Sequence, residues 1–315
     1  MKDLCILIPA FNEAKSLPEL IARIKDVLLL MSLTSSEIIV VNDGSIDGTS
    51  AVISRLSKSI PIRELRFRRN MGKAMALMVG FNKSDSRYLI SIDADLQDYP
   101  EDIPKIYDKL KSGYDLVCGE RVTRNHSKIR GFGSYFYNFF MRKITGISIR
   151  DSNGGLKGYS NKLYKNISIH GQLHRFITLI ASLGGFKIGS IPVKNAPRKH
   201  GISKYPAVRY ESAFDLISIY FIYKAGHVPL HFYAKVSMII FIPALIGALY
   251  FFFSQSLYWM GFGAEHKVFM RPLLLLIPIG LISGIQIFLT GMLFEFILNR
   301  ANLSTEKYIQ MNLEI

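Results

Sequence analysis

Two carboxylates and an amide alternate with apolar residues in the stretch RYLISIDADLQDYP, residues 87–100. Asp93, Asp95 and Gln97 follow an apolar run, Tyr88–Ile92, that is typical of a β-strand. Side chains two residues apart in an extended chain share a face, so these three would point the same way at the strand's carboxyl end. Ligands bind at that edge in open α/β sheets, and such oxygens suit Mg²⁺ or Mn²⁺ holding a diphosphate. A solvated acidic turn would have the same composition, so the rest of the chain must decide.

The elements that would position this stretch alternate between strand and helix. Helices are predicted over Leu17–Leu30, from its apolar stripe, and over Thr49–Leu56, after a turn rich in Gly and Asp. The rhythm indicates an α/β fold with a mostly parallel sheet and right-handed crossovers. The first turn reads P-A-F-N-E, so the glycine fingerprint of a dinucleotide-binding Rossmann fold is absent. Predicted strands cover residues 3–9, 37–41, 63–67, 88–92, 116–119 and 186–193.

The last third of the chain is far more apolar than the rest. Val236–Ala264 and Leu273–Phe294 contain no charged residue. Because a bilayer span needs about 20 apolar residues, we expect two transmembrane helices, at about 232–254 and 273–297. Several glycines in the second helix would allow close packing within the chain or between subunits, so a homo-oligomer stays open. These glycines are Gly280, Gly284 and Gly291.

The chain is therefore expected to have three parts. An α/β domain would occupy residues 1–228, a two-helix transmembrane domain residues 229–300, and a C-terminal tail residues 301–315. Residues 129–146 place aromatic side chains at helical spacing between basic residues, which favours a helix in the membrane interface over one packed on the core. A second interfacial helix is predicted at residues 207–224.

The net charge of +15, from 39 basic and 24 acidic side chains, points to an anionic partner. No zinc-ligand spacing or helix-turn-helix pattern is present, so nucleic acid is not expected. An anionic membrane surface and phosphate-bearing substrates remain.

The cysteines point to a reducing compartment. Cys5 and Cys118 lie in apolar runs and are expected to be reduced core residues. No signal peptide is expected, because the apolar run Leu4–Ile8 is too short. We therefore expect a multi-pass protein of the inner cell membrane with a cytoplasmic α/β domain. Surface or packing roles, not metal binding, are expected for His170, His174 and His200.

Five short motifs follow one another over residues 5–121: I-P-A-F-N-E, V-N-D-G-S-x-D-G-T, N-x-G-K, D-A-D-L-Q-D and G-E-R. In this order they resemble the family-2 glycosyltransferases of GT-A fold. Two later segments, D-S-N-G-G-L-K-G-Y from residue 151 and R-x-x-G-x-S-K-Y from residue 198, are similar to the polyprenyl-phosphate branch. That branch includes dolichol-phosphate mannose synthase and the bacterial undecaprenyl-phosphate sugar transferases. The chain departs from the pattern at Asn42, where many relatives have Asp, and at Gly154, where they often have Cys.

The resemblance implies an inverting hexosyltransferase. It would move a sugar from a UDP- or GDP-linked nucleotide sugar to a membrane polyprenyl phosphate, of undecaprenyl or dolichyl type, for cell-envelope glycan synthesis or modification. Asp95 and Gln97 would hold Mg²⁺ or Mn²⁺. Nucleotide-sugar binding is implied for Pro9, Phe11, Glu13, Val41, Asp43, Asp93, Ala94, Asp95, Gln97 and Arg121. Acceptor-phosphate binding is implied for Arg198, Ser203 and Lys204, and catalysis for Asp93, Asp95, Arg121 and Arg198.

A phosphate acceptor changes what catalysis needs. The second pKa of a lipid monophosphate is near ~6, so the acceptor is largely ionised at neutral pH and no general base is obligatory. Cationic side chains become necessary instead, because donor and acceptor both carry phosphate.

Two alternatives stay open. One is a family-2 transferase acting on another lipid or glycan acceptor, although processive members usually carry Q-x-x-R-W and the single tryptophan here is Trp259. The other is a non-catalytic membrane subunit that keeps the fold. The intact Asp93, Asp95 and Arg121 speak against that second alternative.

Overall fold

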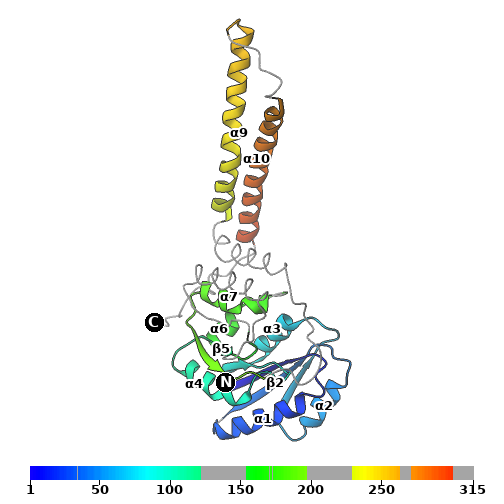
Figure 1. Cartoon of the computed structure of the whole chain (residues 1–315). Coiled ribbons are helices and arrows are strands. Elements are labelled where there is room, and N and C mark those ends of the chain that lie inside the picture. The colour runs from blue at the N-terminus through cyan, green and yellow to red at the C-terminus, as the bar shows by residue number, and fades with distance from the viewer. Residues whose placement is uncertain are drawn as a thin grey trace. The chain divides into compact units, whose positions relative to one another are not determined.

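A computed structural model of the chain describes residues 1–33, 35–121, 154–169, 171, 173–196, 229–262 and 271–300. The chain divides into two compact units, Met1–Ile217 and Ser218–Ile315 (Figure 1). The predicted interfacial helices at 129–146 and 207–224 and the tail at 301–315 lie outside the described residues. The predicted domain boundary after residue 228 stays a prediction.

The first unit is built on a seven-stranded sheet with the order β3-β2-β1-β4-β6-β5-β7. Neighbouring strands run parallel except at β6, which is antiparallel to both β4 and β5. The predicted mostly parallel sheet is confirmed, and β6 is a strand that the sequence did not predict. The strands are β1 Lys2–Ala10, β2 Ser36–Asn42, β3 Ile62–Arg66, β4 Ser86–Ser91, β5 Leu116–Arg121, β6 Lys157–Ser160 and β7 Ile188–Val193.

Helices cover both faces of this sheet, with α1, α2 and α4 on one face and α3, α6 and α7 on the other (Figure 1). The ends of α1 and α2 coincide with those predicted from the sequence. The helices are α1 Leu17–Leu30, α2 Thr49–Leu56, α3 Lys73–Lys83, α4 Ile103–Lys111, α6 Asn161–Asn166 and α7 Ile177–Leu183, with short 3₁₀ turns η1 Pro100–Asp102 and η2 Leu173–Phe176.

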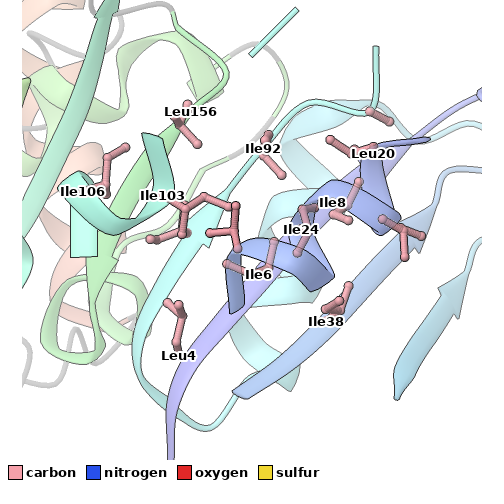
Figure 2. Packing of buried hydrophobic residues seen from close by; sticks show 14 of the residues in the cluster. Leu4, Ile6, Ile8, Leu20, Ile24, Ile38, Ile92, Ile103, Ile106 and Leu156 are labelled. Carbon is pink, nitrogen blue, oxygen red and sulfur yellow. The ribbon is translucent and has the colours of Figure 1, made fainter. Parts of the chain in front are cut away.

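The central strand β1 explains why its sequence is apolar without alternation. Residues 4–8 are all fully buried, because helices cover both faces of the strand. Ile6 lies in the core cluster that includes Ile24 of α1 (Figure 2). On the opposite face, Leu7 packs against α3 at Gly80, where an added Cβ would lie 2.3 Å from the Leu7 side chain.

The strand order reverses beside β1. The chain passes from β1 to β2 and β3 on one side, and then crosses to β4 on the other side. Ligands of open α/β sheets bind at the carboxyl ends of the strands at such a reversal. The loops that follow β1, β2 and β4 meet there, and they carry Phe11, Asp43 and Asp93.

The second unit is a pair of long helices, α9 Pro229–Trp259 and α10 Arg271–Arg300. Both are long and apolar enough to cross a membrane, as the sequence predicted. Gly280, Gly284 and Gly291 all face α9, where an added Cβ would lie 2.5–2.7 Å from a Cβ atom. The close packing expected of these glycines therefore occurs between the two helices of one chain.

Candidate active site

Hydrogen bonds join the loops that follow β1 and β2. The backbone N–H of Asn12 donates to Ser45 Oγ at 2.9 Å, and the Asn12 side-chain oxygen accepts from the Ile46 N–H at 3.0 Å. Asn12 has a φ of 55°, a left-handed conformation that asparagine adopts more readily than most residues. Phe11 and Glu13, which flank Asn12, are therefore held beside the loop after β2.

Three other predicted nucleotide residues lie at the ends of these strands. Pro9 of β1 is the register partner of Val41 of β2, and the Val41 side chain is fully buried. Asp43 accepts the backbone N–H groups of Met71 at 2.6 Å and Gly72 at 3.0 Å. Burial raises the pKa of Asp43 above its ordinary value, although these two N–H groups oppose the rise. Asp43 thus holds the loop that leads into α3.

The Asp93–Gln97 stretch is a turn rather than an extension of the strand. β4 ends at Ser91, and Leu96 has a φ of 61°, which is rare for a residue other than glycine. The expectation of an extended chain is therefore wrong. Asp93, Asp95 and Gln97 are nonetheless each partly exposed, while Ala94 and Leu96 between them are buried. The backbone N–H of Gln97 donates to Asp95 Oδ1 at 3.2 Å and closes the turn.

Lys73 and Asp93 form an ion pair at this edge of the sheet. The Lys73 ammonium lies 2.5 Å and 2.7 Å from the two carboxylate oxygens of Asp93, whose side chain is 32% exposed. Burial opposes ionisation of Asp93, but the charge and hydrogen bonds of Lys73 hold its pKa below the usual value. Lys157, buried on β6, lowers it further. The motifs contained both lysines, but the sequence did not indicate that they converge on Asp93.

A second carboxyl group, Asp98, lies against the first. An added Cβ at Gly155 would lie 2.4 Å from Asp98 Oδ2 and 2.5 Å from Asp93 Oδ2, so the two oxygens are at most about 5 Å apart. Burial and the nearby Asp93 charge raise the pKa of Asp98 to about 7, although Arg121 opposes the rise. Only glycine at position 155 leaves room for this pair of carboxyl groups.

His174 belongs to the same cluster, which agrees with the packing role that was one of the two roles expected for it. It lies in η2, which packs against α3. Burial and the charges of Lys73 and Lys157 lower the pKa of His174 to about 3, with Asp93 and a hydrogen bond to the Gly171 backbone opposing them. The imidazole is therefore neutral at physiological pH. His170 and His200 lie outside the described residues.

The end of β7 brings a further segment to the site. Arg121 at the end of β5 is the register partner of Val193. Beyond Val193, the backbone N–H of Ala196 donates to the Gln97 carbonyl at 2.9 Å, and Asn195 forms an antiparallel bridge with Asp98. The predicted acceptor residues follow directly in the sequence but lie outside the described residues: Arg198, Ser203 and Lys204.

The side-chain oxygens of Asp95 and Gln97 suit a divalent metal ion whose remaining ligands come from a substrate and from water. Mg²⁺ and Mn²⁺ in such sites take one or two carboxylates and complete their shell with phosphate oxygens and water. Within the described part of the chain, no group of three or more His, Cys, Asp or Glu side chains gathers as a protein-only metal cage. The donor set therefore suits a metal bound together with a diphosphate.

Known proteins resemble this chain in sequence and in fold. Residues 5–168 match the family model described as glycosyl transferase family 2. The chain is 28% identical over 302 residues to dodecaprenyl-phosphate galacturonate synthase of Rhizobium johnstonii, covering 94% of this chain and 87% of that protein. It is 32% identical over 216 residues to undecaprenyl-phosphate 4-deoxy-4-formamido-L-arabinose transferase of Pseudomonas fluorescens, covering 68% of this chain and 63% of that protein.

A solved structure of glucosyl-3-phosphoglycerate synthase from Mycobacterium tuberculosis, in complex with Mn²⁺, UDP and phosphoglyceric acid, shares the fold. The TM-score is 0.56 at 18% identity, over 69% of this chain and 78% of that one. The sheet and its loops thus define a GT-A fold. The chain belongs to glycosyl transferase family 2 and is a glycosyltransferase, which confirms the family that the motifs predicted.

Proposed function

We propose that this enzyme transfers a sugar from a nucleotide sugar to the phosphate of a membrane polyprenyl lipid. The hydrogen bond from Ala196 to Gln97 carries the proposal, because it ties the donor loop to the segment that reaches Arg198 two residues later. A basic segment beside a diphosphate site suits an anionic acceptor. The relatives from Rhizobium johnstonii and Pseudomonas fluorescens, whose names specify polyprenyl phosphates, support the same acceptor class.

The donor would lie over the loops after β1, β2 and β4. Phe11, Glu13 and Asp43 would surround the nucleoside, and Asp95 and Gln97 would hold Mg²⁺ or Mn²⁺. The metal ion, when bound, would neutralise the negative charge on the departing nucleoside diphosphate. The nucleotide would be UDP or GDP; glucosyl-3-phosphoglycerate synthase, which shares the fold, binds UDP with Mn²⁺ or with Mg²⁺.

The remaining site residues would align the two substrates. Lys73 keeps Asp93 ionised and fixed in one orientation, and Arg121 lies at the end of the neighbouring strand β5. Arg198, Ser203 and Lys204 would bind the acceptor phosphate, which attacks the anomeric carbon in line and inverts it. The phosphate oxygen is already ionised, so none of these side chains needs to remove a proton.

The second unit would anchor the enzyme in the membrane that contains its acceptor. α9 and α10 would be the two spans, and residues 1–228 the catalytic domain. The buried thiols of Cys5 and Cys118 suit a cytoplasmic location for that domain, where nucleotide sugars are made available.

Separate Michaelis constants for donor and acceptor test these assignments. Asp95→Ala should abolish metal-dependent transfer, while Arg198→Ala should raise KM for undecaprenyl phosphate more than KM for the nucleotide sugar. Asp85→Ala, at an exposed acid outside the site, is the matched control. Full activity of Asp95→Ala would contradict the metal assignment, and a product with retained anomeric configuration by NMR would contradict a single displacement.

A further inference from the structure

Two buried polar atoms near the carboxyl pair have no hydrogen-bond partner. Among the described residues, these are Nδ1 of His174 and Nδ2 of Asn195. Buried polar atoms in folded proteins are nearly always hydrogen-bonded, and leaving one unsatisfied is destabilising. Two such atoms in one region therefore suggest that a bound molecule completes their hydrogen bonds.

The two side chains border the same carboxyl groups from different elements. His174 lies in η2, which packs against α3, the helix that begins at Lys73, and its imidazole is within electrostatic range of the Lys73–Asp93 pair. Asn195 lies across the antiparallel bridge from Asp98, and side chains directly opposite each other in such a pair lie on one side. The carboxyl oxygens of Asp93 and Asp98 in turn converge on Gly155.

The hydrogen-bonding properties of these two atoms limit which chemical groups of a ligand could bind them. A neutral imidazole has one donor and one acceptor nitrogen, and an amide nitrogen can only donate. An amide N–H does not bind a metal ion, and in the proposed function the diphosphate would lie at Asp95 and Gln97, held through the metal. Hydroxyl groups both donate and accept, so they satisfy a pair of this kind.

We propose that His174 and Asn195 are specificity-determining residues that hydrogen-bond hydroxyl groups of the donor's sugar. The proposal rests on the proposed function, because it requires a nucleotide sugar at the Asp93–Gln97 turn. The two residues would recognise the sugar, while the loops after β1 and β2 would recognise the nucleotide. A hydroxyl-binding pair of this kind discriminates strongly against a sugar that lacks the matching group.

Apolar substitutions test the assignment in the purified full chain. His174→Leu and Asn195→Leu remove the unsatisfied atoms, so each variant alone should melt at the wild-type Tm or higher. UDP and GDP should raise the Tm of the variants as they do for wild type. The additional rise that UDP-glucose, UDP-galacturonate or GDP-mannose gives over the free nucleotide should be lost. With the sugar that wild type transfers, kcat/KM should fall about tenfold or more.

Asn82→Leu, at an exposed position on α3, is the matched control and should change none of these values. Wild-type responses to the nucleotide sugars in both Leu variants would overturn the inference. Loss of the response to free UDP and GDP as well would also overturn it, since the residues would then support the fold of the site. If a Leu variant does not fold, the same Tm and kcat/KM measurements are made on His174→Ala or Asn195→Ala.

If the proposed function itself is wrong, the same experiments give a different result. Wild type itself would then transfer none of these sugars to undecaprenyl phosphate and would melt at the same temperature with the nucleotide and with the nucleotide sugar. That result would overturn the proposed function and this inference together. Normal transfer by wild type with unchanged variants would overturn the inference alone.

Discussion

The side-chain amide of Asn42 donates a 3.0 Å hydrogen bond to Glu64 Oε1 and a 2.7 Å hydrogen bond to Ser50 Oγ. Ser50 Oγ in turn donates to the same Glu64 oxygen at 2.8 Å. Asn42 is fully buried at the end of β2. The asparagine at this position is therefore matched to a carboxylate on β3.

Asn42→Asp should destabilise the first unit, because it sets two carboxylates at hydrogen-bond distance in a buried position. We expect a loss of about 1–3 kcal/mol at neutral pH. Thermal unfolding of the purified chain measures it. The double variant Asn42→Asp/Glu64→Gln should recover most of the loss, since a donor again faces a carboxylate. If Asn42→Asp were as stable as wild type, this pairing would have no energetic importance.

Lys73→Met should lower kcat/KM about 10- to 100-fold, because it removes the direct ion-pair partner of Asp93 beside an anionic donor and leaves only the more weakly acting Lys157 to offset that charge. Lys73→Arg keeps the charge and should retain more activity. Lys83→Met, on the exposed end of α3, should leave kcat/KM unchanged. Steady-state transfer assays separate these cases, and full activity in Lys73→Met would show that Asp93 works without its partner.

Glu295→Ala should loosen the helix pair of the second unit. Glu295 Oε2 accepts the backbone N–H of Leu230 at 3.1 Å, in the first turn of α9, where a carboxylate also interacts favourably with the helix dipole. We expect a loss of about 1–3 kcal/mol, with a smaller loss for Glu295→Gln, which keeps an acceptor oxygen. Thermal unfolding in detergent measures both variants. Gln286→Ala, at an exposed position on α10, is the control, and an equal effect there would argue against this contact.

The buried thiol of Cys5 should make the folded chain less stable at alkaline pH. Burial raises the pKa of the Cys5 thiol to about 12. The unfolded chain ionises this thiol near pH 8.5, so the stability of the folded state should fall as pH rises from about 8.5 towards 12, by up to about 1.4 kcal/mol per pH unit. Unfolding of Cys118→Ala and of Cys5→Ala/Cys118→Ala between pH 8 and 10 tests this. Parallel pH profiles for the two chains would contradict it.

The parts of the fold that local sequence determines were predictable. The apolar stripe of α1 and the Gly-rich turn before α2 predicted both helices with their observed ends. β6 was not predicted, because its four residues contain Lys157 and Gly158 and show no apolar run. Lys157 is buried there only because β4 and β5 flank it. That placement depends on tertiary structure, which periodicity does not encode.

The same limit applies to the site. Asp93, Asp95 and Gln97 stood out because three polar side chains followed an apolar strand. Lys73, Asp98 and His174 act through partners that are distant in sequence, so only the folded chain identifies their roles. The N-x-G-K motif was the one available signal for Lys73, and nothing in the sequence distinguished His174 from a packing histidine.

The mass of the lipid product tests the central claim most directly. The purified full chain would be incubated with Mg²⁺ or Mn²⁺, a panel of UDP- and GDP-sugars, and either undecaprenyl phosphate or undecaprenol. The proposed function predicts a new lipid heavier by one sugar residue, formed only with the phosphate-bearing acceptor and absent with Asp95→Ala. Transfer to undecaprenol, or no product from any donor with undecaprenyl phosphate, would contradict it.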